Sequence, residues 1–123
     1  MPYEGAFCDL MWSDPDDSIQ TWGVSPRGAG WHFGEKVTKE FIQINGIGLI
    51  ARAHQLVMDG YRFWFTAENL VTIWSAPNYC YRCNNDAAFM HVTDNKCKNF
   101  IKFKKVHDKD RVVNYSTIVP YFL

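Results

Sequence analysis

The chain has 123 residues, of which 47% are apolar, and its 13 Lys and Arg residues balance its 13 Asp and Glu residues. This composition is typical of a folded globular domain and excludes a disordered chain, which has few apolar residues and a large net charge. No run approaches the about 18 apolar residues of a membrane-spanning helix, and the first residues lack the basic and apolar pattern of a signal peptide. We therefore expect a cytoplasmic or nuclear protein with no membrane partner.

The charges are unevenly distributed along the chain. Residues 1–60 carry four Lys and Arg against eight Asp and Glu, whereas residues 61–123 carry nine against five. The basic stretch Lys102–Lys105 has the charge of a nucleic-acid contact, but such a run is also the usual solvated face of a surface strand. We favour the solvated face and expect no nucleic-acid partner.

Residues 1–34 are rich in turn formers and show little periodicity, so we expect a loop that covers a site, with one short strand near Asp9–Trp12. Arg27 stands between Ser25-Pro26 and Gly28-Ala-Gly30, where glycines let the backbone approach an anion and a guanidinium can bind a phosphate with two hydrogen bonds. A surface arginine beside a turn is an equally good interpretation. The same segment holds three acidic residues that suit either a hard cation or a simple turn: Asp14, Asp16 and Asp17.

The clearest helix is predicted over Glu35–Asn45. Val37, Phe41 and Ile44 share one helical face, and Gly46 suits the position after the last turn. Five strands are expected after it: Leu49–Ala53 as a buried strand, Tyr61–Phe65 after a tight Asp59-Gly60 turn, Val71–Trp74, Ala87–Val92 and Asn99–Phe103. One helix followed by consecutive strands predicts an α+β fold.

Two predicted strands end in residues whose side chains can bind a ligand or transfer a proton, and we expect both strand ends to face one site. His54 follows the first strand, where an imidazole can bind a metal, shuttle protons or satisfy a buried polar network. Ser75–Tyr79 follows the third strand as a loop, because Pro77 cannot continue a ladder. Tyr79 can hydrogen-bond a phosphate or a water there, or it can simply cap the sheet.

The four cysteines are expected to be reduced, because the chain shows no secretion signal. Cys80-Tyr-Arg-Cys83 has the spacing of a metal site, with His91 and Cys97 as candidate further ligands of a structural zinc. One such pair is a weak signal, so we favour free thiols on an exposed loop.

Taken in order, the motifs resemble those of the phosphoprotein phosphatases, which are metal-dependent serine/threonine protein phosphatases. The motifs are Cys8-Asp-Leu-Met-Trp-Ser-Asp-Pro-Asp16, Ser25-Pro-Arg-Gly-Ala-Gly30, Phe33-Gly34, Arg52-Ala-His-Gln-Leu-Val57, Gly60-Tyr61, Ser75-Ala-Pro-Asn-Tyr-Cys-Tyr-Arg-Cys83 and Tyr121-Phe-Leu123. The branch resembles type 2A. Glu4-Gly-Ala-Phe-Cys-Asp, Gly30-Trp-His-Phe-Gly and Thr72-Ile-Trp-Ser look most like its type-6 members.

The resemblance implies hydrolysis of phosphoserine and phosphothreonine esters by two divalent metals, commonly manganese, iron or zinc. His54 resembles the last histidine ligand of that metal site, and Arg27 the arginine that grips the substrate phosphate. Tyr79 resembles the tyrosine on the loop over the metals, and Asp14 an acidic residue that lines the same cleft. The resemblance therefore implies three catalytic residues, Arg27, Tyr79 and Asp14, and one metal ligand, His54.

Further features follow from the same resemblance. Cys80 and Cys83 lie in the loop where members of the family meet toxins, and Leu123 resembles a C-terminal leucine whose carboxylate is methylated. Asn84 stands where the family usually has glycine, so we expect asparagine in a left-handed conformation, which it tolerates. The implied fold is the C-terminal part of the metallophosphatase β-sandwich flanked by helices. Residues 1–123 would then form the C-terminal portion of a catalytic domain.

The family motifs GDxHG, GDxxDRG and GNHE do not occur in this sequence. They carry most of the metal ligands, and one histidine cannot hold two metals. We therefore expect the isolated chain to have no or very weak activity on phosphoproteins, although it supplies one ligand of the intact enzyme. The alternative is a non-catalytic module that binds phosphatase scaffold or regulatory subunits.

Overall fold

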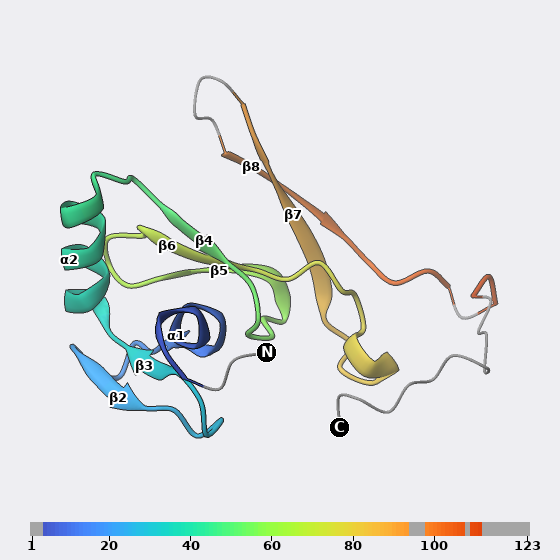
Figure 1. Ribbon diagram of the computed structural model, residues 1–123. Helices are drawn as coiled ribbons and strands as arrows, with labels where there is room; N and C mark the ends of the chain where they lie inside the picture. The colour runs from blue at the N-terminus through green and yellow to red at the C-terminus, as the bar shows by residue number, and fades with distance from the viewer. Residues whose placement is uncertain (1–3, 94–97, 108, 112–123) are drawn as a thin grey trace.

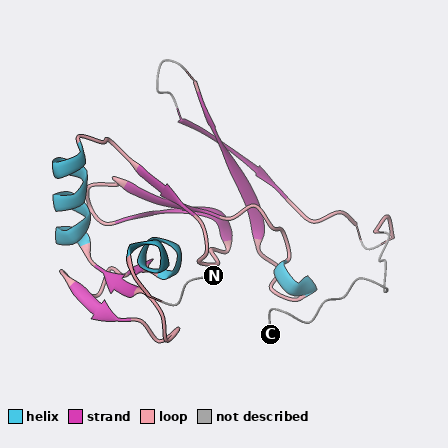
Figure 2. Cartoon of the chain, viewed as in Figure 1, coloured by secondary structure: helices cyan, strands magenta, loops and turns pink. Residues whose placement is uncertain are grey.

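The computed structural model describes residues 4–93, 98–107 and 109–111 of the chain. Its described part contains two helices, a short 3₁₀ turn and two β-sheets (Figures 1 and 2). This arrangement confirms the α+β prediction. Cys97, Leu123 and the apolar residues 119–122 lie outside the described residues. Within the described part, no helix is long and apolar enough to cross a membrane.

The first element is a helix, α1 (Ala6–Trp12), so the strand predicted near Asp9–Trp12 is wrong. Gly5 precedes the helix with a φ of 86°, and Ser13 ends it in an extended conformation. Cys8 is buried and Trp12 follows one turn later on the same side, which gives the segment a helical period of four residues. The helix is only 7 residues long, so this period was too short to recognise in the sequence.

A three-stranded sheet follows, in the order β1-β3-β2. Its strands are β1 (Asp14–Pro15), β2 (Trp22–Val24) and β3 (Trp31–Phe33). β1 pairs with β3 in parallel and β2 pairs with β3 antiparallel. Residues 4–34, the described part of the segment expected as a covering loop, are therefore not simply a loop. They form a small scaffold that fixes Asp14 on a strand and leaves Arg27 on the β2–β3 connection.

α2 (Glu35–Asn45) has the bounds that the sequence predicts. Gly46 ends the helix in the left-handed region with a φ of 62°, and its N–H bonds back to the last turn. The buried side chain of the helix is Thr38, whose hydroxyl donates to the carbonyl of Gly34 at 3.2 Å. Phe41 and Ile44, by contrast, are exposed.

The larger sheet has five strands in the order β4-β6-β5-β7-β8. These strands are β4 (Ile50–Arg52), β5 (Asp59–Trp64), β6 (Leu70–Ile73), β7 (Asp86–Val92) and β8 (Lys98–Phe103). Each contains most of one predicted strand, so the five strand predictions are confirmed to within a few residues. Figure 1 shows the β7–β8 hairpin extending away from the other strands.

The core of this sheet lies on β6, where Leu70, Val71 and Thr72 are fully buried. Two details differ from the prediction. β4 lies at the edge of the sheet beside β6 and is only half-buried, because β5 pairs with the other side of β6. Asp59-Gly60 begins β5 rather than forming a separate turn; Gly60 is required there because a Cβ would lie 2.6 Å from the carbonyl carbon of Ala87.

Candidate functional site

The candidate site is organised around the carboxylate of Asp14, whose side chain is only 3% exposed. Asp14 begins β1, directly after the end of α1, and its carboxylate contacts Arg27 on the β2–β3 connection. Its Oδ2 accepts a hydrogen bond from Arg27 Nε at 2.6 Å, and its Oδ1 accepts one from Arg52 Nη2 at 2.7 Å. One buried carboxylate therefore holds two guanidinium groups.

The charge of Asp14 follows from these contacts. Burial by itself raises the pKa of the carboxyl group, but the hydrogen bonds and charges of Arg27 and Arg52 outweigh burial and lower the pKa below its usual value. Asp14 is therefore ionised at neutral pH. A buried anion between two cations leaves the cluster with a net positive charge, which suits an anionic ligand.

Arg27 keeps part of its guanidinium available. Its backbone N–H donates to Ser25 Oγ at 3.2 Å, which fixes the turn, and its side chain is 34% exposed. Within the described residues, the hydrogen bonds of the Arg27 side chain use Nε alone. The two Nη groups, which form the outer edge of the guanidinium, can therefore donate to a phosphate.

Arg52 belongs to the same cluster, and sequence reasoning did not assign it a role. Its Nη2 also donates to the carbonyl of Ser13 at 2.7 Å, and its Nη1 donates to Gln55 Oε1 at 3.3 Å. The side chain is 15% exposed, so its donors are used inside the protein. The role of Arg52 depends on its contact with Asp14, which lies 38 residues earlier in the chain.

His54 lies beside the pair, just past β4, in the left-handed region with a φ of 74°. Its Nδ1 lies 4.0 Å from Asp14 Oδ1, is buried and has no hydrogen-bond partner in the part of the chain that the structure describes. The edge of the ring packs against Trp12 with 5.2 Å between centroids. Burial and the charge of Arg27 lower the pKa of His54, although Asp14 partly opposes them. The imidazole is therefore neutral at neutral pH and presents a free nitrogen.

A neutral imidazole with an unpartnered nitrogen fits one coordination position of a divalent metal. It does not by itself make a metal centre. No group of three or more His, Cys, Asp or Glu side chains that could hold a metal occurs in the described part of the chain. Asp16 and Asp17 point elsewhere: Asp16 pairs with His32 and Asp17 with Arg62.

Tyr79 lies in a separate turn, the 3₁₀ segment Tyr79–Tyr81. Its ring packs edge-on against Trp74 at 4.8 Å, and its N–H donates to Asn85 Oδ1 at 2.8 Å. The contacts of the described residues do not join Tyr79 to Asp14, Arg27 or His54. The structure thus brings together three of the four predicted site residues, and the meeting of both strand ends at one site stays a prediction.

The turn itself is tightly held. Asn78 Oδ1 accepts from the N–H of Asn84 at 2.9 Å, and Asn84 has the left-handed conformation that the sequence predicts, with a φ of 53°. Cys80 is exposed and Cys83 is half-buried, and both are free thiols, as expected. Cys97 lies outside the described residues, and the zinc alternative gains no support from the described ones.

The comparisons with known proteins agree with this geometry. The model of the calcineurin-like phosphoesterase family matches residues 1–58, which include Asp14, Arg27, Arg52 and His54. The serine/threonine-protein phosphatase ppe1 of Schizosaccharomyces pombe is 62% identical over 113 residues, which are 92% of this chain and 37% of the relative. The serine/threonine-protein phosphatase 6 catalytic subunit of Drosophila melanogaster is 53% identical over 123 residues, which are 100% of this chain and 40% of the relative.

A solved serine/threonine phosphatase from Saccharomyces cerevisiae, described as similar to human phosphatase PP5, has the same fold. It superposes with a TM-score of 0.77 and 32% identity over 89% of this chain and 37% of that chain. This chain therefore spans about two fifths of the length of the relatives it matches. Within that span its motifs, its fold and its sequence are similar to those of serine/threonine protein phosphatases, and residues 1–58 match the calcineurin-like phosphoesterase family.

Proposed function

We propose that the chain forms part of an enzyme that hydrolyses phosphoserine and phosphothreonine in proteins, and that Arg27 binds the substrate phosphate. The observation that carries this proposal is the way Asp14 holds Arg27. The carboxylate binds Nε, and both Nη groups have no hydrogen-bond partner among the described residues, in a cluster of net positive charge. A planar fork of donors matches two oxygens of a phosphate.

The three charged residues have different roles in this proposal. Arg27 touches the phosphate. The contacts of Asp14 make it a positioning residue, because its carboxylate orients the guanidinium of Arg27. Arg52 holds Asp14 in place with donors that are already used by the protein, so it acts through Asp14 and not on the substrate.

His54 would hold a metal ion through its free nitrogen in the intact enzyme. The bound metals of such a site supply a water of lowered pKa and neutralise the charge of the phosphoryl group. In this proposal, Arg27 holds the phosphate and His54 contributes one metal ligand. The remaining metal ligands come from the GDxHG, GDxxDRG and GNHE motifs, which do not occur in this sequence. Manganese, iron and zinc all accept an imidazole ligand.

The remaining assignments belong to the same proposal. Tyr79 supports the reacting phosphate from its loop, Cys80 and Cys83 form the toxin-facing loop, and Leu123 is the site of carboxyl methylation. Phosphoproteins are the substrates, scaffold or regulatory subunits are the partners, and the enzyme works in the cytoplasm or nucleus.

The test uses a chimera in which this chain replaces the 113 aligned residues of the fission-yeast relative. We expect manganese-dependent hydrolysis of a phosphothreonine peptide. Arg27→Ala lowers kcat/KM on the order of 10²–10³-fold, because one charged donor group to the phosphoryl oxygens is lost. Arg27→Lys restores the charge but not the fork, so it recovers only part of the activity.

Arg62→Ala is the matched control, since Arg62 is an exposed arginine that also pairs with an aspartate, Asp17. It leaves kcat/KM unchanged. An Arg27→Ala chimera as active as the parent would overturn the role of Arg27. The isolated chain is assayed beside the chimera, and robust turnover by it alone would contradict the need for further metal ligands.

The second candidate function is a binding module without catalysis. It is favoured by the uncovered apolar residues of the chain, among them Leu10 and Phe41. Capture of scaffold or regulatory subunits by the isolated chain, without phosphatase activity, supports it.

A further inference from the structure

Trp12, the last residue of α1, contacts His54 just past the end of β4. The two ring centroids lie 5.2 Å apart and the ring planes are at 82°, which is an edge-to-face geometry that aromatic rings prefer. The two residues are far apart along the chain, so the tertiary structure brings the rings together. The contact joins a helix end with no assigned role to the residue that is proposed to bind a metal.

The ring of His54 lacks the hydrogen bond that usually orients a metal-binding histidine. Such a histidine normally donates its second ring N–H to a carboxylate, a carbonyl or a water, and this bond fixes the plane of the ring. In the described part of the chain, the polar and aromatic contacts of the His54 side chain are the Trp12 contact and the approach of Nδ1 to Asp14 Oδ1. That approach, at 4.0 Å, is too long for a hydrogen bond. The aromatic contact is therefore the one that can set the orientation of the imidazole.

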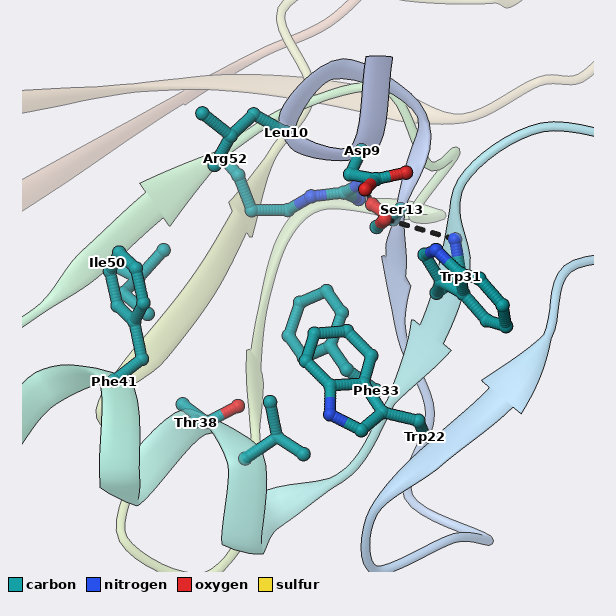
Figure 3. A pocket seen from close by; sticks show the side chains of 11 residues that line it. Asp9, Leu10, Ser13, Trp22, Trp31, Phe33, Thr38, Phe41, Ile50 and Arg52 are labelled. Atoms are coloured by element: carbon teal, nitrogen blue, oxygen red, sulfur yellow. Dashed lines mark hydrogen bonds between the residues drawn. The ribbon is translucent and has the colours of Figure 1, made fainter. Parts of the chain in front are cut away.

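The backbone that carries Trp12 is held from two sides. Ser13 Oγ accepts a hydrogen bond from the N–H of Trp31 at 3.0 Å, and the Ser13 carbonyl accepts one from Arg52 Nη2 at 2.7 Å (Figure 3). Gly30 packs so closely that a Cβ on it would lie 2.7 Å from the carbonyl carbon of Trp12 and 2.9 Å from its Cβ. The indole therefore projects from a fixed point and can restrict the ring that it touches.

We propose that Trp12 is a positioning residue, whose indole fixes the orientation of the His54 imidazole for metal binding. The inference rests on the proposed role of His54 as a metal ligand and deepens it by naming what orients that ligand. The edge-to-face contact takes the place of the hydrogen bond that other metal-binding histidines use. Without the indole the imidazole can rotate, and the apparent affinity for the metal falls with the fraction of molecules in the competent orientation.

The test measures manganese binding to the metal-free chimera by isothermal titration calorimetry. We expect Trp12→Leu to raise the Kd for Mn²⁺ by about tenfold, the lower end of the effect of removing a group that orients a metal-binding histidine. Trp12→Phe keeps an aromatic edge and recovers most of the affinity. Trp22→Leu is the matched control and leaves Kd unchanged, because the described ring contact of Trp22 is with Phe33, at 6.3 Å between centroids.

Kinetics separate a positioning role from a merely structural one. Because Trp12→Leu weakens metal binding, saturating manganese restores its kcat/KM on a phosphothreonine peptide. The loss caused by Arg27→Ala persists at saturating manganese, since that variant lacks a phosphate contact. A folded Trp12→Leu chimera that has the parent's Kd for Mn²⁺ would overturn the proposal, and so would an equal rise in Kd for Trp22→Leu.

Nuclear magnetic resonance of the unmodified, metal-free chimera gives a measurement that does not depend on any variant folding. We expect nuclear Overhauser effects between the indole protons of Trp12 and the ring protons of His54, whose signals are assigned with His54→Gln. Absence of these effects would overturn the proposal.

The variant His54→Gln also distinguishes this inference from the proposed function. If His54→Gln weakens manganese binding and Trp12→Leu does not, the positioning role of Trp12 is overturned and the metal-binding role of His54 stands. If His54→Gln binds manganese as tightly as the parent, the metal-binding role of His54 is overturned, and the positioning role of Trp12 with it.

Discussion

Asp14→Asn is the substitution that tests the organisation of the site most directly. Each oxygen of the carboxylate accepts from a different arginine, Oδ2 from Arg27 and Oδ1 from Arg52. An amide of the same shape has one acceptor, and its NH₂ group would face the N–H donors of the second guanidinium. The substitution therefore removes a charge from between two cations and also places donor against donor.

The size of the effect follows from the burial of the two partners. Arg52 is 15% exposed, so losing its counter-charge costs about 2–3 kcal/mol, somewhat below the range for a fully buried pair. Arg27 is 34% exposed, and solvent screening reduces its share to about 0.5–1 kcal/mol. The free energy of unfolding of the chimera should fall by about 3 kcal/mol.

The assay is urea unfolding of the chimera, followed by tryptophan fluorescence, together with kcat/KM for a phosphopeptide. Asp17→Asn is the control, because Asp17 pairs with Arg62 at the exposed surface and should contribute less than about 1 kcal/mol. A loss below about 1 kcal/mol for Asp14→Asn would refute the argument. So would a variant that loses stability but keeps full kcat/KM, because Arg27 would then not need Asp14 for its orientation.

Two further substitutions test other contacts. Hydrogen bonds from Ser18, together with a weaker contribution from His32, lower the pKa of Asp16, so this carboxylate stabilises the fold above pH about 3.8 and loses its effect as pH falls through the lowered value. Acid titrations monitored by circular dichroism should show Asp16→Asn less stable than the parent at neutral pH, with the gap closing in acid; a constant gap would refute this. Trp64→Phe removes the buried bond from Trp64 Nε1 to Thr72 Oγ1 at 2.8 Å, and thermal unfolding should show a loss of about 1–3 kcal/mol. A Tm equal to that of the parent would contradict it.

Short-range sequence patterns are sufficient to predict the elements whose formation depends mainly on neighbouring residues. α2 has an apolar period and a glycine stop, and both its ends are as predicted. The five later strands were also predictable, since each is a β-rich run between turn residues. α1 was not, because a 7-residue helix shows too little of its period. The exposed edge of β4 was missed for another reason: an apolar run does not say which strands will lie beside it.

The site residues also differ in whether short-range sequence patterns reveal them. Arg27 and His54 stand out in the sequence because of their neighbours, a Gly-flanked loop and a strand end. The role of Arg52 depends on Asp14, which is 38 residues away along the chain, and on the small sheet that directs Asp14 beneath the loop. No spacing rule contains that information. The turn with Tyr79 was correctly expected as a loop, but its packing against Trp74 depends on the tertiary structure.

The proposed phosphate grip is complete within the described residues, whereas the proposed metal site is not. Asp14, Arg27 and Arg52 satisfy one another within the described chain, so their geometry needs no outside residue. Among the described residues, the buried Nδ1 of His54 beside them has no hydrogen-bond partner, which costs free energy until a ligand reaches it. An arginine that is oriented in advance loses little entropy when a phosphate binds. The described residues can therefore hold the proposed phosphate grip in an oriented state, while the proposed catalysis depends on metal ligands in addition to His54.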